Sequence, residues 1–165
     1  MKKYMLSGLL TMLSLTTLAD TPTLKTLFVA MPDSVIPYLS KNNRLDFIDF
    51  MESNMKAEVT NELGGKSCMT ALADDSITIQ LNEACKVDLL LLNTTEQVDS
   101  CQQVIAMIRT LGLQNEHTES TLDFYSLKWH KLSAKPALMS ADEKRLPTLV
   151  KTSNILKLIQ EKLNK

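Results

Sequence analysis

Glycine is scarce in this 165-residue sequence, which contains four. Phosphate-binding loops of nucleotide-binding proteins need several glycines at fixed spacing, because only glycine lets the backbone approach a phosphate so closely. From residue 20 onward the chain has Gly64, Gly65 and Gly112, and these cannot form such a loop. The sequence also has no G-x-S-x-G turn for a nucleophilic serine. Both classes of site are therefore excluded.

Histidine is rarer still, with His117 and His130 alone. Zinc sites bring several histidines or cysteines together at short, recurring spacings, and the histidines and cysteines of this chain match no such pattern. Glu116-His117-Thr118-Glu119 offers metal-binding atoms but reads as a solvated polar loop. We expect no metal and no cofactor.

Neither sign of charge dominates the chain, since Lys and Arg total 18 against 19 Asp and Glu. The positive residues form no basic stripe that would follow a phosphate backbone, so nucleic-acid binding is disfavoured. After residue 20 no apolar run is long enough to span a bilayer, so we expect no transmembrane anchor.

The first nineteen residues have the three parts of a secretory signal. Lys2 and Lys3 form a short basic start, and Met5–Leu15 is an apolar run too short for a stable membrane anchor. Small residues follow, so we place cleavage between Ala19 and Asp20. The residue directly after that site is Asp20 rather than a cysteine, which argues against lipid attachment. The alternative is a buried N-terminal helix. The signal predicts a periplasmic or secreted protein whose residues 20–165 form one domain.

Three cysteines, Cys68, Cys85 and Cys101, can form at most one internal disulfide in an oxidising compartment. They can all be small core residues. Alternatively, Cys85 and Cys101 can pair, because both lie near ends of the same strand connection. A reactive thiol or a metal site is the third reading.

An amphipathic helix is predicted after Asn42-Asn43, which we expect to cap it. Its apolar stripe consists of Leu45, Phe47, Ile48, Phe50, Met51 and Met55. Its solvent side is expected to carry Arg44, Asp46, Asp49, Glu52, Ser53 and Lys56.

From Ala57 the period of the apolar residues changes from that of a helix to that of strands. The predicted strands cover residues 68–72, 77–81, 87–92, 104–111, 121–126 and 129–132. Short turns join them, which favours an antiparallel meander of five or six strands in an α+β fold.

Two of these strands, 87–92 and 104–111, are apolar on both faces and need a cover on each side. The N-terminal helix can cover one face, and either the C-terminal segment or a partner chain covers the other. In that segment Ser140 and Glu143 predict a capping box, and Asn154–Leu163 has the stripe of an amphipathic helix.

Several short motifs carry a resemblance to a known family. They are Phe28-Val29-Ala30-Met31-Pro32-Asp33-Ser34 with Pro37-Tyr38-Leu39, then Asn43-Arg44-Leu45-Asp46-Phe47-Ile48-Asp49-Phe50, Leu63-Gly64-Gly65, Phe124-Tyr125 and Trp129. Over residues 24–133 the chain resembles the exported Bacteroidetes proteins grouped as domain of unknown function 3256. The resemblance implies a host group and a compartment outside the cytoplasm, but no activity and no site residues.

That host group implies one modification. Bacteria of this kind glycosylate exported proteins on Ser or Thr within an Asp-Ser/Thr-aliphatic motif, and Asp33-Ser34-Val35 and Asp75-Ser76-Ile77 both fit. Ser34 and Ser76 are therefore candidate O-glycosylation sites. The alternative is that each is an ordinary cap or turn serine.

Two hypotheses of function remain. The first is a non-enzymatic binding or assembly module of the cell envelope, which meets an unknown envelope protein or ligand with its sheet face or an exposed strand edge. The second is a periplasmic hydrolase or thiol-dependent enzyme whose site assembles from distant residues. Its candidates are Cys85 or Cys101, His117, and the helix carboxylates Asp46, Asp49 and Glu52. A purely structural role is the third option.

Overall fold

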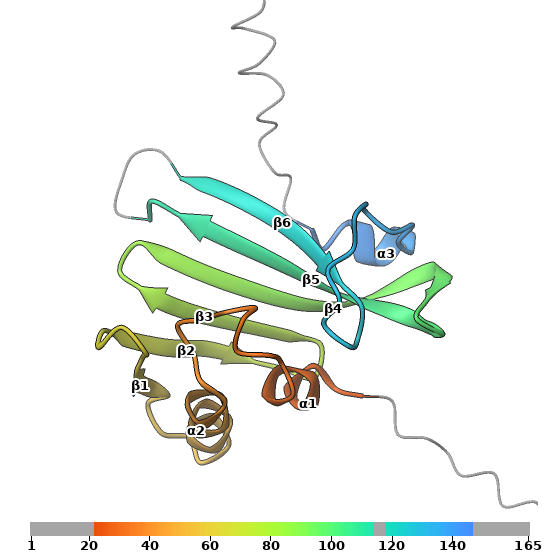
Figure 1. Cartoon of the computed structure of the whole chain (residues 1–165). Helices are drawn as coiled ribbons and strands as arrows, with labels where there is room; N and C mark the ends of the chain where they lie inside the picture. Colours follow the sequence, from red (N-terminus) through yellow and green to blue (C-terminus); the bar gives the residue numbers. More distant parts are fainter. Residues whose placement is uncertain (1–21, 114–117, 147–165) are drawn as a thin grey trace, which may run out of the picture.

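The computed structural model describes residues 22–113 and 118–146. Two helices precede a sheet and a short helix follows it (Figure 1). Within the described residues the elements are α1 (Leu24–Val29), α2 (Lys41–Glu52), β1 (Glu58–Thr60), β2 (Lys66–Leu72), β3 (Ser76–Asn82), β4 (Cys85–Val98), β5 (Cys101–Leu111), β6 (Glu119–Tyr125) and α3 (Ser140–Glu143). The predicted signal with its Ala19–Asp20 cleavage site, His117, and the predicted helix Asn154–Leu163 lie outside these residues.

The sheet is an antiparallel meander with the strand order β1-β2-β3-β4-β5-β6, and each strand pairs with its neighbour in the chain. The predicted α+β class and meander are confirmed. The predicted strand over residues 129–132 is wrong, because Trp129 has a φ of 64° and the chain turns there. Only one isolated bridge, Tyr125 to Lys131, remains in that segment.

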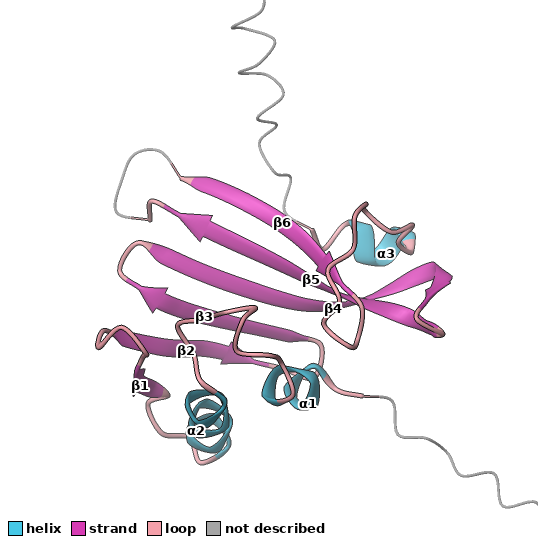
Figure 2. Cartoon of the chain, in the orientation of Figure 1, coloured by secondary structure: helices cyan, strands magenta, loops and turns pink. Residues whose placement is uncertain are grey.

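Helices α1 and α2 lie on one face of the sheet, over its β1–β4 part (Figure 2). We call this the inner face. The main core lies here, with Leu24, Phe28 and Phe47 from the helices and alternate strand residues such as Ile79 and Leu89. Each fully buried side chain of this size stabilises the fold by about 1.5–3 kcal/mol.

The start of α2 corrects the predicted cap. The helix begins after Ser40, whose hydroxyl accepts a hydrogen bond from the Asn43 backbone N–H at 3.4 Å. The Asn43 side chain accepts in return from the Ser40 backbone N–H at 3.2 Å. Asn43 is therefore the third helical residue of a capping box rather than the cap. Leu45 and Met55, placed in the apolar stripe, are 39% and 52% exposed.

The other face of the sheet, the outer face, has a second core of Leu92, Val104, Ala106, Phe124 and Leu138. Leu138 comes from the segment after β6, and Leu146 packs against the same core. The prediction that the C-terminal segment covers this face is confirmed for the described residues. The predicted capping box is wrong, since Ser140 is already helical and the cap residue Met139 makes no side-chain cap bond.

Asp142 ties the C-terminal segment to the sheet. Its buried carboxylate accepts hydrogen bonds from the Asn93 backbone N–H at 3.0 Å, the Asn93 side chain at 2.9 Å and Arg145 at 3.1 Å. Burial acts to raise the pKa of Asp142, but the Asn93 and Arg145 interactions outweigh it and hold that pKa below its ordinary value of 3.8.

We expect Asp142→Asn to lower the free energy of unfolding by about 1–3 kcal/mol at neutral pH, because the amide offers a donor to groups that are themselves donors. A carboxyl with a lowered pKa stabilises the fold above its unfolded-state pKa and loses this effect as pH falls through the folded-state value. The difference between wild type and variant should therefore close below about pH 3.8. Urea unfolding from neutral to acid pH measures it, with the exposed Glu143→Gln as control. A difference that persists at acid pH would contradict this role.

Candidate functional site

A cavity of about 390 Å³ lies on the inner face, where the linker between α1 and α2 meets the ends of β3, β4 and β5. Its apolar lining consists of Ile36, Pro37, Leu81, Ala84, Cys85 and Leu111. Tyr38, Asn82 and Arg109 add polar groups. We call it the Arg109 pocket. Its volume lies within the range of small-molecule sites.

The strand register sets the sheet side of the pocket. Cys85 pairs with Leu111, and Val87 pairs with Arg109, near the end of the β4–β5 ladder where β4 begins. Residues two apart in a strand point to the same face, so Cys85, Arg109 and Leu111 share the inner face with the core residue Met107. The pocket thus continues the main core toward solvent.

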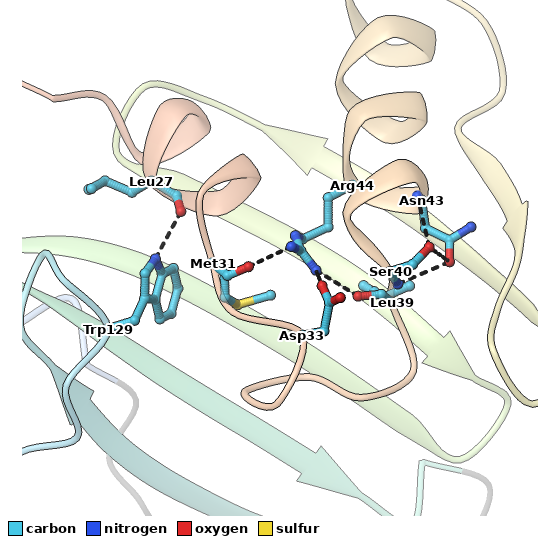
Figure 3. Close-up of polar contacts among 8 residues, drawn as sticks. All are labelled: Leu27, Met31, Asp33, Leu39, Ser40, Asn43, Arg44 and Trp129. Atoms are coloured by element: carbon cyan, nitrogen blue, oxygen red, sulfur yellow. Dashed lines mark hydrogen bonds and ion pairs between the residues drawn. The ribbon is translucent and has the colours of Figure 1, made fainter.

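A buried arginine fixes the linker side. Arg44 is 1% exposed, and its guanidinium donates to the Leu39 carbonyl at 2.7 Å, to the Asp33 carboxylate at 2.8 Å, and to the Met31 carbonyl. Figure 3 shows the guanidinium between these groups of the linker. Arg44, expected on the solvent side of the helix, is instead the residue that holds the pocket wall in place.

Arg109 is half-buried and lines the pocket, and no carboxylate of the described residues forms an ion pair with it. Among the described residues its one hydrogen-bond partner is the Met107 sulfur at 3.7 Å, a weak acceptor. Arg44 and Arg145, by contrast, each contact a carboxylate. The described pocket lining therefore presents an uncompensated cation beside apolar walls.

Cys85 lies in the same pocket and is 7% exposed. Burial raises the pKa of its thiol, and the positive charge of Arg109 offsets only part of that effect. A thiol with a raised pKa stays protonated at neutral pH and is a poor nucleophile. Cys85 therefore belongs to the pocket as an apolar lining group.

The predicted Cys85–Cys101 disulfide is incompatible with this structure. Cys85 begins β4 and pairs with Leu111, whereas Cys101 begins β5 and pairs with Val98 at the other end of the hairpin. Along β5 the distance from Cys101 to Leu111, the partner of Cys85, is roughly 33 Å, far beyond the reach of a disulfide. All three cysteines are free thiols.

The structure does not bring together those enzyme candidates that lie within its described residues. Asp46, Asp49 and Glu52 are exposed on α2, and Glu52 pairs with Lys25. Cys101 lies near the tip of the β4–β5 hairpin, far from Cys85. The described ranges contain no cluster of three His, Cys, Asp or Glu residues able to hold a metal ion.

The two candidate modification sites differ in accessibility. Ser34 is exposed in the turn of the α1–α2 linker, whereas Ser76 is half-buried and begins β3, paired with Leu90. The helices of residues 22–113 and 118–146 are too short to cross a bilayer, the longest having 12 residues.

The fold and the pocket define an α+β domain with one antiparallel meander and a ligand-sized pocket at the end of its helix-covered face. The chain belongs to the family described as "Protein of unknown function (DUF3256)", whose model matches residues 17–160. The resemblance seen in the sequence is confirmed. No curated protein matches the chain.

One solved structure that the chain resembles is a domain of an uncharacterized protein from Porphyromonas gingivalis W83. The TM-score is 0.54 at 25% sequence identity, and the match covers 67% of this chain and 54% of that chain. The chain therefore spans about half of that structure's length. Neither comparison assigns an activity.

Neither Arg109 nor Arg44, the two arginines that define the site, was identified from the sequence. Arg109 left a signal, because it is the one charged residue of the predicted strand 104–111, which is otherwise mostly apolar. Arg44 also left a signal, because at spacings of three and four it lies on the same helical face as Phe47 and Ile48. Its charge, rather than its position in the helix, led to the expectation that it faces solvent.

Proposed function

We propose that this protein is an exported, non-enzymatic binding module of the cell envelope and that its ligand occupies the Arg109 pocket. The observation that carries the proposal is the pocket itself: about 390 Å³, apolar walls continuous with the core, and a half-buried cation with no counter-ion among the described residues. The sequence alone suggests binding through a sheet face or an exposed strand edge. The pocket at the end of the inner face is a better-defined site.

The chemistry of the lining favours binding over turnover. General acid–base or nucleophilic catalysis needs a base within hydrogen-bond reach of the reacting group. The described lining of the pocket has no carboxylate and no imidazole, and its thiol has a raised pKa. The groups present can hold and orient a ligand.

Export is tested by N-terminal sequencing of the protein recovered from cell fractions. The proposal expects a chain that starts at Asp20 in the periplasmic or secreted fraction. A chain that retains Met1 in the cytosol would overturn the compartment.

Binding is tested by native mass spectrometry of protein purified gently from its host. We expect the wild type to retain a small molecule and Ala84→Trp, which fills the pocket from the exposed β3–β4 turn, to lose it. Ala73→Trp is the matched control, because Ala73 is exposed in the β2–β3 turn, away from the pocket. Catalytic turnover of a substrate, or the absence of any retained molecule, would count against a binding module.

We also propose Ser34, in preference to Ser76, as the O-glycosylated residue. A glycosyltransferase must reach an exposed hydroxyl, and Ser34 lies in an exposed turn whereas Ser76 belongs to a sheet strand. Intact mass of protein from the native host should exceed the unmodified mass, and Ser34→Ala should return it to that value, while Ser76→Ala should not. An unmodified wild-type mass ends the idea.

A further inference from the structure

We infer that the Arg109 pocket binds an amphiphilic carboxylate, with the carboxylate on Arg109 and an aliphatic body against the apolar walls. The inference rests on the proposed binding function and names the chemical class of ligand.

The apolar walls of the Arg109 pocket fit the aliphatic body of such a ligand. Ile36 and Leu81 are each 1% exposed and form a preformed apolar surface, while Leu111 at the rim remains 45% exposed. Covering exposed apolar surface yields roughly 25 cal/mol per Å². A hydrocarbon body gains this stabilisation mainly at the rim, where Pro37, Ala84 and Leu111 are exposed, while Ile36 and Leu81 supply the packed apolar surface behind it.

The guanidinium of Arg109 fits the carboxylate of the ligand. A guanidinium has five N–H donors in a planar fork, and the weak bond to the Met107 sulfur leaves most of them free. Its positive charge also opposes the effect of burial on the pKa of Cys85, which lines the same pocket, so the charge acts on the pocket lining. A carboxylate matches the fork with two parallel hydrogen bonds.

The surrounding charges leave Arg109 available. Asp123 lies on β6 opposite Met107, next to Arg109 on the inner face, but its carboxylate is held by Lys131 at 2.8 Å. No acidic side chain of the described residues lines the pocket to repel an anion. Arg109 is the one cation among the described lining residues, which suits a singly charged carboxylate better than a phosphate dianion.

The test is isothermal titration calorimetry of the full mature chain with three probes: decanoate, decanol of equal chain length, and acetate. We expect decanoate to bind, decanol to bind more weakly, and acetate to show no binding. Arg109→Gln should weaken decanoate binding about 10- to 100-fold, the usual effect of losing a hydrogen bond to a charged group. Arg109→Lys should fall between the two.

Two controls accompany the titration. Lys128→Gln removes an exposed cation outside the pocket and should leave decanoate binding unchanged. Ala84→Trp should abolish binding of decanoate and decanol alike. Circular dichroism verifies that each variant is folded, and Arg109→Lys keeps the test decisive if Arg109→Gln does not fold.

The outcomes separate the ligand class from the proposed function. If decanol binds as well as decanoate and Arg109→Gln changes nothing, the carboxylate assignment is overturned while pocket binding stands. If no probe binds but the natively retained molecule is lost in Ala84→Trp, the ligand class is wrong and the binding function survives. If neither probe nor native molecule binds, both fail.

Discussion

Replacing Arg44 with alanine is expected to lower the free energy of unfolding by about 3–5 kcal/mol. The guanidinium is buried and donates to the Met31 and Leu39 carbonyls, which keep no equivalent partner once it is removed. Each buried acceptor left unsatisfied costs about 1–3 kcal/mol, and the vacated volume adds a packing loss. A domain of this kind is stable by only about 5–15 kcal/mol, so the loss is a large share of the total.

Urea unfolding followed by tryptophan fluorescence measures the effect. Asp33→Asn is the matched control, because the Asp33 side chain is 65% exposed and its pairing with Arg44 is expected to contribute less than about 1 kcal/mol. Arg44→Lys should be intermediate, since an ammonium keeps the charge but cannot reach both carbonyls as a planar fork does. An Arg44→Ala variant within 1 kcal/mol of wild type, on the scale of a surface substitution, would refute the role assigned to the guanidinium.

The burial of Arg44 was not predicted from the sequence. Periodicity along residues 41–52 correctly placed Phe47 and Ile48 in the core, because both contact the sheet beneath their own helix. Arg44 is buried by the linker that folds back over the start of the helix, and only the tertiary structure brings that linker there. Helical spacing puts Arg44 on the same face as Phe47 and Ile48, but it does not show which carbonyl groups would accept hydrogen bonds from a buried guanidinium there.

The sheet was predictable because its signals are local. Strict alternation in residues 77–81 and short turns identify neighbouring strands, and the doubly apolar Leu89–Leu92 run indicates two covered faces. The length of the β4–β5 hairpin was not predictable in this way. In its outer part only Asn93 and Val98 pair with β5, and the polar residue Thr94 pairs with Leu138 instead. That extension moves Cys101 away from Cys85.

The pocket was beyond prediction for a related reason. Its lining comes from residues 36–38, 81–85 and 109–111, which the register and the linker bring together. A lone arginine in an apolar strand was the one available hint. The sequence thus determines the site through pairing and packing, whereas motif searches depend on short spacings.

Trp129 connects the turn after β6 to helix α1. It is the single tryptophan of the chain and is 6% exposed. Its Nε1–H donates to the Leu27 carbonyl in α1 at 2.9 Å, and its ring packs 5.7 Å from the Tyr125 ring (Figure 3 shows the Leu27 contact). The side chain therefore joins the turn after β6 to the first helix, two segments about a hundred residues apart in sequence.

Trp129→Ala is expected to cost about 3–5 kcal/mol, because a large buried ring leaves a cavity and the Leu27 carbonyl loses its donor. Trp129→Phe should cost about 1–3 kcal/mol, since it keeps most of the ring packing and loses the hydrogen bond. Far-UV circular dichroism must follow urea unfolding here, as these variants have no tryptophan.

The backbone at this position supplies an internal control. At a φ of 64° a residue with a Cβ is strained, whereas glycine adopts this conformation freely. In an ordinary helix or strand glycine is about 0.5–1 kcal/mol less stable than alanine. At position 129 the order should reverse or vanish, so that Trp129→Gly is at least as stable as Trp129→Ala. If alanine proves clearly more stable than glycine, the left-handed turn is not the conformation that this residue adopts in solution, and the contact with α1 must be held by a different backbone.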